Sequence, residues 1–277
     1  NGDNLENSQL FNKIIPNIHI GKIPIMLKSN ICVLTQYKHS PDSTGECKFD
    51  SGGYFIINGS EKTVIGQERA AENKIYVHKQ TKNTKWSWIA EIKSVPDFKC
   101  ISPKQINVMI STKNNGFGHG IYIQMPRIKI PIPVFILFRA LDIISDKEIC
   151  KYILLDISQE NNKKMLFSLQ ASIIDANEVL TKEEAIQYIT DNVIYTPINM
   201  DKETGLKKKR MFTNEILEND LFPHCKSQVQ KIYYLGYMVN QLLQCRFGWK
   251  KESDRDSYVN KRIDLTGTLI NNLFRNY

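Results

Sequence analysis

The order of strand-like and helix-like segments is the feature that most constrains the fold of this chain. Up to about residue 125, short apolar runs alternate with turn residues, which is typical of β-strands. From Pro133 onward, apolar residues recur at the spacing of amphipathic helices. The sequence therefore predicts a mixed α/β (α+β) fold.

The clearest local signal lies at Asn58 and Gly59, between apolar runs at 54–57 and 63–65. Asn-Gly readily accepts the positive φ angles of a type I′ turn, so the two runs are predicted to form a β-hairpin. Neither arm alternates cleanly between apolar and polar residues, which predicts burial on two faces. Further strands of the first part are expected at 18–26, 31–34, 74–77 and 86–92.

The central part is expected to hold two more strands, at 105–111 and 120–125. The glycine-rich stretch 113–120 between them lacks the GxxxxGK[ST] spacing of a phosphate-binding loop and is followed by a strand, so it is interpreted as a hairpin loop. Helices are then predicted at 134–144, 148–157, 163–174, 181–189, 214–222 and 226–247.

Three local patterns refine these helices. Thr181 and Glu184 have the spacing of a capping box, and Thr213 is predicted to cap the helix 214–222. The helix 226–247 carries a stripe that we expect to pack into a core, formed by apolar residues at 229, 232, 235, 239, 242 and 243.

Composition excludes several classes of protein. The chain has 277 residues, of which 42% are hydrophobic, so wholesale disorder is excluded. No apolar run approaches the ~18 residues that span a bilayer, and no membrane association is expected. The formal net charge of +8 favours a polyanionic partner. The densest basic run, 207–210, is interpreted as a solvated face, with a nuclear-localisation signal or nucleic-acid patch as the weaker alternative. Because the chain begins with Asn1, we expect it to be cut from a longer polypeptide.

The sequence contains none of the common catalytic motifs: it has no nucleophile elbow, zinc-binding His pair or P-loop. Asp254 and Asp256 loosely suggest a Mg²⁺ motif, but Arg255 between them and the basic pair at 261–262 favour ion pairing. On its own, the chain does not look like a catalyst.

Three separated blocks nevertheless resemble one protein family. They are residues 21–29 (GKIPIMLKS), residues 47–62 (CKFDSGGYFIINGSEK) continuing to 67–69 (QER), and residues 254–265 (DRDSYVNKRIDL). Together they resemble the second-largest (β-like) subunit of multisubunit DNA-directed RNA polymerases of the eukaryotic, archaeal or large-DNA-virus type. The tetrapeptides at 221–224 (LFPH) and 235–238 (LGYM) match the same family in order.

The resemblance implies a β-rich protrusion domain that is discontinuous in sequence, with an inserted α+β lobe domain. The expected boundaries are 1–94 for the first part of the protrusion, 95–252 for the lobe and 253–277 for the returning protrusion segment. Ser253, Val259, Thr266 and Thr268 depart from the residues usual in the family, which indicates a divergent member.

The resemblance also implies a function in transcription. The chain is expected to be a non-catalytic part of a nucleotidyltransferase, to line the channel that holds DNA and the RNA–DNA hybrid, and to contact the largest subunit, other polymerase subunits and, through the lobe, general transcription factors. No cofactor is expected here, because the catalytic Mg²⁺ belongs to the largest subunit. The compartment would be the nucleus or a cytoplasmic viral factory. The alternative is a stand-alone basic nucleic-acid-binding module derived from the same domains.

The expected nucleic-acid contacts are Gln67, Arg69, Lys261 and Arg262. The hairpin at 58–59 would aim the strand that follows it at the channel, which makes Gln67 a wall residue and Arg69 a contact to the phosphate backbone. The alternative for Arg69 is an ion pair with Glu61 or near Glu68. The alternative for the basic pair is an internal salt bridge between Asp256 and Arg262.

Overall fold

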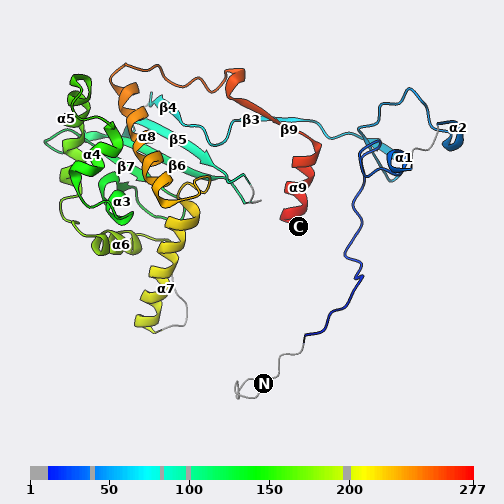
Figure 1. The fold of residues 1–277 in the computed structure, drawn as a ribbon, viewed down its shortest axis with the longest axis horizontal. Coiled ribbons are helices and arrows are strands. Elements are labelled where there is room, and N and C mark those ends of the chain that lie inside the picture. The colour runs from blue at the N-terminus through cyan, green and yellow to red at the C-terminus, as the bar shows by residue number, and fades with distance from the viewer. Residues whose placement is uncertain (1–11, 38–40, 82–83, 98–100, 196–200) are drawn as a thin grey trace, which may run out of the picture. The chain divides into compact units, whose positions relative to one another are not determined.

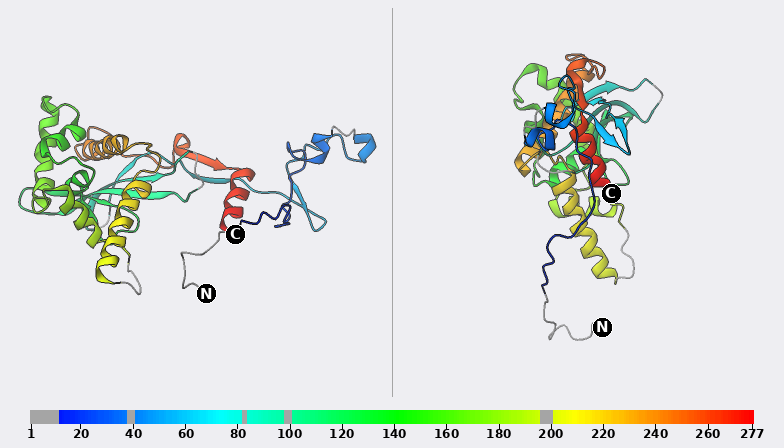
Figure 2. Two further views of the ribbon diagram at one scale, coloured as in Figure 1. Left: turned by 60° about the horizontal axis from the view of Figure 1, so that its bottom comes forward. Right: turned by 90° about the vertical axis from the view of Figure 1, so that its right-hand side faces the viewer.

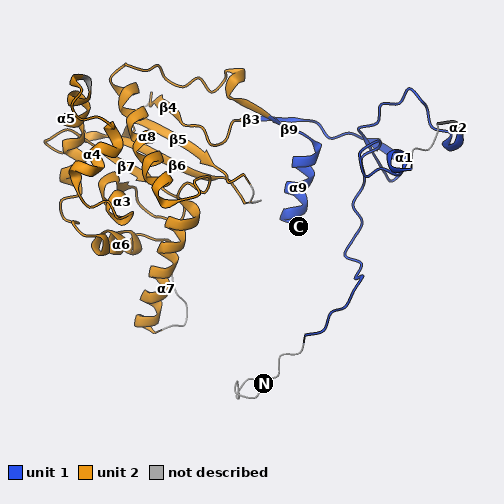
Figure 3. Ribbon diagram, viewed as in Figure 1, with its two compact units in different colours: residues 1–68, 263–277 blue, residues 69–262 orange. Residues whose placement is uncertain are grey.

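The structure, a computed structural model, describes residues 12–37, 41–81, 84–97, 101–195 and 201–277 (Figure 1). The chain divides into two compact units, which Figure 3 colours separately. Unit 1 comprises residues 1–68 and 263–277, and unit 2 comprises residues 69–262. Helices and strands occur in both parts of the chain, which confirms the predicted mixed α+β class.

The unit boundaries fall at 68/69 and 262/263, whereas the expected domain boundaries lie at 94/95 and 252/253. The difference arises because residues 76–94 form two strands of the unit 2 sheet. The division into a protrusion and a lobe, with those boundaries, stays an expectation about domains of the family.

The core of unit 2 is one antiparallel sheet in the order β4-β5-β6-β7-β8. Its strands are β4 (Tyr76–Lys79), β5 (Trp86–Ser94), β6 (Lys104–Asn114), β7 (His119–Gln124) and β8 (Ile132–Pro133). In register, Ala90 lies opposite Val108, and Val108 lies opposite Ile123. This confirms the strands predicted at 86–92, 105–111 and 120–125, and the hairpin loop between the last two.

Alternation along the strands explains which face of the sheet is buried. In the stretches 90–94 of β5, 106–110 of β6 and 121–123 of β7 every second side chain is fully buried, for example Ile92, Ile106 and Ile121. Successive residues of a strand point to opposite faces, so these side chains form a single apolar face. Helices α3 and α8 contact the sheet, and their buried side chains belong to the same cluster.

The helices of unit 2 follow the sheet in the chain, as predicted. They are α3 (Val134–Ala140), α4 (Asp146–Leu154), α5 (Glu160–Asp175), α6 (Lys182–Asp191), α7 (Lys202–Glu215) and α8 (Gln228–Arg246). The capping box of α6 is confirmed: Thr181 accepts from the Glu184 amide, and the Glu184 carboxylate accepts from the Thr181 amide at 3.1 Å.

The predicted helix 214–222 with Thr213 as its cap is wrong. Helix α7 runs through Thr213 and continues as a π-helix at Ile216–Asp220, and together they extend away from the sheet in Figures 1 and 2. The Thr213 hydroxyl donates to the Lys209 carbonyl at 3.0 Å and accepts from the Thr190 hydroxyl. A threonine that bonds back one turn can sit inside a helix, and this is why it does not cap one here.

Helix α8 confirms the longest predicted helix, and Ser227 caps it. Most of its predicted apolar stripe is buried, but Val229 is exposed. Gly236 lets α8 approach α4 closely, because a Cβ at that position would lie 2.2 Å from the Tyr152 carbonyl oxygen.

A buried arginine ties three helices of unit 2 together. The Arg139 side chain on α3 is only 2% exposed. Its guanidinium donates to the Ala176 carbonyl at 2.6 Å and to the Val179 carbonyl, and it pairs with Asp146 at 2.6 Å. A charged group this deeply buried is tolerated when it is paired and hydrogen-bonded. Arg139 therefore fixes α3 against the start of α4 and the connection between α5 and α6.

In unit 1, the hairpin is confirmed as β1 (Phe55–Ile57) and β2 (Ser60–Lys62), with Ile57 opposite Ser60. Asn58 and Gly59 have φ angles of 52° and 77°, as a type I′ turn requires. The prediction of burial on two faces is wrong, because Ile56 and Ile57 are exposed. The second arm is the polar run 60–62 and not the apolar run 63–65, so it supplies no second apolar face.

The strands predicted at 18–26 and 31–34 are also wrong. Residues 12–26 form neither helix nor strand, and residues Val33–Gln36 form the short helix α1. Pro24 lacks the amide hydrogen that a central strand needs, and the isoleucines of this segment are exposed. Unit 1 also contains α2 (Pro41–Thr44) and α9 (Thr266–Asn276).

A two-stranded sheet joins β3 (Gln67–Ala70) to β9 (Lys261–Asp264). The boundary between the units passes through both strands. Among the residues that the structure describes, no helix is long and apolar enough to cross a membrane.

Candidate nucleic-acid interface

The residues predicted to contact nucleic acid lie on the paired strands β3 and β9. Gln67 and Arg69 belong to β3, and Lys261 and Arg262 belong to β9. The two strands pair although almost 200 residues of chain separate them. Of these residues, Arg69, Lys261 and Arg262 belong to unit 2, and Gln67 belongs to unit 1.

Hydrogen bonds around Asn260 fix the start of β9 in unit 2. Its backbone carbonyl accepts from the Ala71 amide at 2.8 Å and from the Tyr76 hydroxyl at 3.3 Å. Its side-chain amide donates to the Asp254 carbonyl, and its side-chain oxygen accepts from the Lys74 ammonium. Because Asn260 is buried and uses both ends of its side chain, it holds the adjacent basic residues in one register.

The loop before Asn260 is ordered by a carboxylate. The Asp254 side chain accepts from the backbone amides of Asp256 at 2.9 Å and Ser257 at 3.3 Å. An aspartate that bonds amides two and three residues ahead closes a tight turn. Among the described residues no group of three or more His, Cys, Asp or Glu side chains is placed to hold a metal ion.

Arg255 has the structural role expected of it. Its guanidinium pairs with Glu91 on β5, and it lies over the Tyr76 ring at 5.9 Å from the ring centre. It also lies near His78, and burial together with the Arg255 charge lowers the pKa of that histidine. Arg255 thus ties the loop before β9 to the sheet.

Arg69 is half-exposed and forms an ion pair with Glu72, at 3.0 Å between Nη1 and Oε1. Its charge is therefore partly compensated within unit 2. The sequence offered an ion pair of Arg69 with Glu61 or near Glu68 as the alternative. Arg69 does form an ion pair, but its partner is Glu72 and not Glu61. A pair this exposed contributes little to stability and can open to accept a phosphate.

The two basic residues of β9 differ in environment. Lys261 pairs with Asp256 at 3.8 Å, and its side chain is 23% exposed. Arg262 is exposed, and its Nη1 donates to the carbonyls of Lys261 at 2.7 Å and Val259 at 3.3 Å. The alternative bridge between Asp256 and Arg262 is wrong, because Asp256 pairs with Lys261 instead.

Within the described part of the chain, Arg262 has no carboxylate partner. A guanidinium held by carbonyls keeps its full positive charge and presents several donors in a plane, which suits phosphate oxygens. Arg262 is therefore the strongest single candidate for a phosphate contact on β9.

Gln67 lies at the start of β3 and is exposed, and its side-chain amide donates to the Ile65 carbonyl at 3.3 Å. Sequence reasoning missed the roles of Asn260, Lys74 and Glu72. The only signal for Asn260 was its position next to the basic pair. Nothing pointed to Lys74, because its partner Asn260 is distant in sequence, whereas the spacing of Arg69 and Glu72, three residues apart, could have suggested their ion pair.

A known protein family matches most of unit 2. The model of the family described as RNA polymerase Rpb2, domain 2 matches residues 71–264, which is more than half of the chain. This range differs from unit 2 by two residues at each end.

Similar proteins come from eukaryotes, a virus and an archaeon. The chain is 35% identical to DNA-directed RNA polymerase II subunit 2 of Arabidopsis thaliana, over 99% of this chain and 23% of that protein. It is 33% identical to DNA-directed RNA polymerase subunit 2 of Acanthamoeba polyphaga mimivirus, over 94% of this chain and 22% of that protein. It is 30% identical to DNA-directed RNA polymerase subunit Rpo2 of Saccharolobus solfataricus, over 93% of this chain and 22% of that protein. The chain thus spans about a fifth of the length of these relatives.

Proposed function

We propose that the chain forms part of the second-largest subunit of a DNA-directed RNA polymerase, because it belongs to the family described as "RNA polymerase Rpb2, domain 2". The family match over residues 71–264 is the observation that carries this proposal. The stand-alone module has no observation in its favour, since each relative described above is named as a polymerase subunit.

In this role the chain contributes to a nucleotidyltransferase without supplying the reacting groups. Bond formation between nucleotides would take place elsewhere in the enzyme, and the catalytic Mg²⁺ would be held by the largest subunit. The contribution of this chain is to shape the channel through which DNA and the RNA–DNA hybrid slide. Sliding requires contacts to phosphates and not to base edges, because phosphates repeat along any sequence.

The basic residues of β3 and β9 would provide those contacts. Arg262 would contact a phosphate directly, since it is exposed and lacks a carboxylate partner in the described chain. Lys261 and Arg69 would add charge by exchanging Asp256 and Glu72 for a phosphate. Gln67, at the start of β3, would be a wall residue of the channel.

The partners follow from the same role. We propose that the chain contacts the largest subunit and other polymerase subunits, and that the segment 95–252, as the lobe, also docks general transcription factors. The polymerase would work in the nucleus or in a cytoplasmic viral factory, the settings suggested by the eukaryotic and viral relatives.

Co-purification tests this proposal directly. The protein that contains this chain is tagged in its own cell or infected host and purified at moderate salt. We expect a largest polymerase subunit at equal stoichiometry and RNA synthesis on a primed template. Recovery of the tagged protein alone, without a largest subunit or synthesis activity, would refute the proposal.

A further inference from the structure

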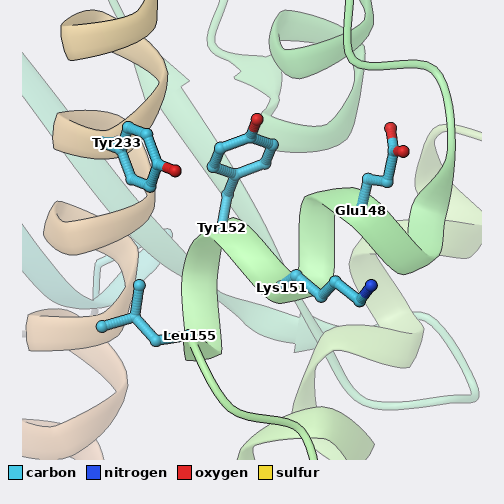
Figure 4. Close-up of a pocket in the computed structure, with 5 residues that line it drawn as sticks. All are labelled: Glu148, Lys151, Tyr152, Leu155 and Tyr233. Atoms are coloured by element: carbon cyan, nitrogen blue, oxygen red, sulfur yellow. The ribbon is translucent and has the colours of Figure 1, made fainter.

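Two Asn-Gly pairs of the described chain can react within themselves, Asn58–Gly59 and Asn115–Gly116. In such a pair the glycine amide nitrogen lies within reach of the asparagine side-chain carbonyl carbon, and glycine has no side chain to shield it. The side chains that line the hollow between α4 and α8 in Figure 4 include no asparagine, histidine or cysteine, so that surface offers no comparable reaction. The two pairs are identical in sequence but differ in their surroundings.

At Asn115 the groups that the reaction needs are held by hydrogen bonds. The side-chain nitrogen of Asn115 donates to the Asp175 carboxylate at 2.8 Å, and its side-chain oxygen accepts from the Phe117 amide at 3.1 Å. The Gly116 nitrogen, which would attack, donates to the Asn114 side-chain oxygen at 2.8 Å. These bonds fix the side chain and occupy the attacking nitrogen, so this pair is protected.

At Asn58 neither group is held. Within the described chain, no hydrogen bond involves the Asn58 side chain or the Gly59 amide. The register places Ile57 opposite Ser60, so the ladder between the two strands does not use the Gly59 amide. Both residues of the pair are exposed, and a Cβ added to Gly59 would meet nothing within 4 Å. The pair therefore has room for a ring to form and is open to water.

The hairpin that carries Asn58 can open locally at small cost. Its strands β1 and β2 have three residues each, and Ile56 and Ile57 are 56% and 41% exposed. A two-stranded hairpin with so little burial is only marginally stable by itself. Local opening gives Asn58 the backbone freedom that closing a ring onto the next residue requires.

We propose that Asn58 is a site of spontaneous deamidation and that Asn115 is its protected counterpart. The Gly59 amide nitrogen loses its proton to hydroxide and bonds to the side-chain carbonyl carbon of Asn58. The carbon–nitrogen bond of the side-chain amide then breaks, and the nitrogen takes up a proton and leaves as ammonia. Water opens the resulting succinimide ring at either carbonyl carbon and leaves aspartate or isoaspartate at position 58. The reaction is independent of the proposed function, because it consumes only water and uses only groups of the hairpin.

Either product changes the hairpin. Both add a negative charge to the turn, and isoaspartate also adds a carbon to the main chain between Ile57 and Ser60. The length of a two-residue turn fixes the register of its strands, so the longer main chain should unpair Ile57 from Ser60. The modification therefore loosens the segment that leads into β3, in a fraction of the protein that grows with time.

Peptide mapping of the aged protein tests this proposal. The tagged full-length protein is purified with the subunits that accompany it, incubated in heavy-oxygen water at mildly alkaline or mildly acidic pH, and digested. Mass spectrometry then measures conversion at positions 58 and 115 in the same digest. We expect Asn58 to convert about 100-fold faster than Asn115, the factor by which breaking two or three ordinary hydrogen bonds slows a reaction. The product should carry an oxygen from water and should form faster at alkaline pH.

Two controls accompany the measurement. Asn58→Gln moves the amide one carbon farther from the Gly59 nitrogen, and it should abolish the label that protein isoaspartate methyltransferase places on this peptide. A synthetic peptide of residues 54–63 shows that the conditions suffice for the reaction. Equal conversion at positions 58 and 115, faster conversion at 115, or an unmodified Asn58 while the free peptide converts would each overturn the proposal. These results come from the wild-type protein, so they hold even where Asn58→Gln does not fold. Co-purification with a largest subunit is scored separately, so the proposed function does not depend on the outcome.

Discussion

Replacing Arg262 by alanine should weaken binding of nucleic acid in a way that depends on salt. Arg262 is exposed on β9, and in the described chain only carbonyl oxygens accept from its guanidinium. Neutralising one phosphate changes the slope of log affinity against log salt concentration by about 0.9. One lost contact therefore reduces affinity about 15-fold at about 50 mM monovalent salt and about 4-fold at about 200 mM.

The assay is fluorescence anisotropy of a labelled RNA–DNA hybrid with the purified polymerase, repeated over that range of salt. Lys207→Ala is the matched control, because it removes the same charge from an exposed side chain of unit 2 that pairs with Glu203 at 2.9 Å. We expect a slope shallower by about 0.9 for Arg262→Ala and the wild-type slope for Lys207→Ala. Equal slopes for the wild-type protein and both variants, or equal losses of affinity in Arg262→Ala and Lys207→Ala, would refute the reasoning.

Three further predictions concern Lys261, Arg139 and His224. Lys261→Ala should change the slope less than Arg262→Ala does, because Asp256 already compensates the Lys261 charge. A larger change for Lys261→Ala in the same salt titration would contradict this. Arg139→Met should lower the free energy of unfolding by about 1–3 kcal/mol, because it leaves the Ala176 and Val179 carbonyl groups without their donor, whereas the half-exposed Asp146 carboxylate can be hydrated. Urea unfolding followed by tryptophan fluorescence measures the change, and an unchanged free energy of unfolding is the contrary result. Burial lowers the pKa of His224 in the folded protein below its ordinary 6.5, so the unfolded chain binds more protons than the folded one below that pH. The free energy of unfolding should be constant above about pH 6.5 and fall as the pH drops toward the pKa of His224 in the folded protein. Urea titrations at several pH values measure this fall, and His224→Gln should reduce it.

Much of unit 2 could be predicted because its signals are local. The capping box at Thr181 depends on residues three apart, and the alternation along β5 to β7 follows from the face that each strand buries. The hairpin turn at Asn58 and Gly59 is equally local. In each case the side chain or backbone that decides the structure lies within a few residues of its partner.

Predictions failed where the deciding partner is distant or missing. The apolar run 18–26 has the composition of a strand, but in the structure it has no strand to pair with. Thr213 has the identity of a cap, but its hydroxyl bonds Lys209 one turn earlier and Thr190 on another helix. Composition cannot show either outcome, because both depend on which other segments are packed nearby.

In the candidate interface, too, some features could be predicted from the sequence and others depend on contacts in the folded chain. The family resemblance selected Gln67, Arg69, Lys261 and Arg262, and the structure places them on paired strands. Which of them carries uncompensated charge depends on the positions of Glu72, three residues after Arg69, and of Asp256, in the turn that the Asp254 carboxylate closes. The ranking of these residues therefore required coordinates.

The most direct test of a nucleic-acid interface on β9 maps contacts from the nucleic acid side. A stalled elongation complex is assembled on a scaffold with photoreactive nucleotides at successive positions of the template strand and the RNA. Crosslinked peptides are then identified by mass spectrometry. We expect a peptide containing Lys261–Asp264 among the crosslinked products of this chain, and its loss in the Arg262→Ala complex. Crosslinks confined to other segments of the chain, with none to this strand at any position, would contradict the account.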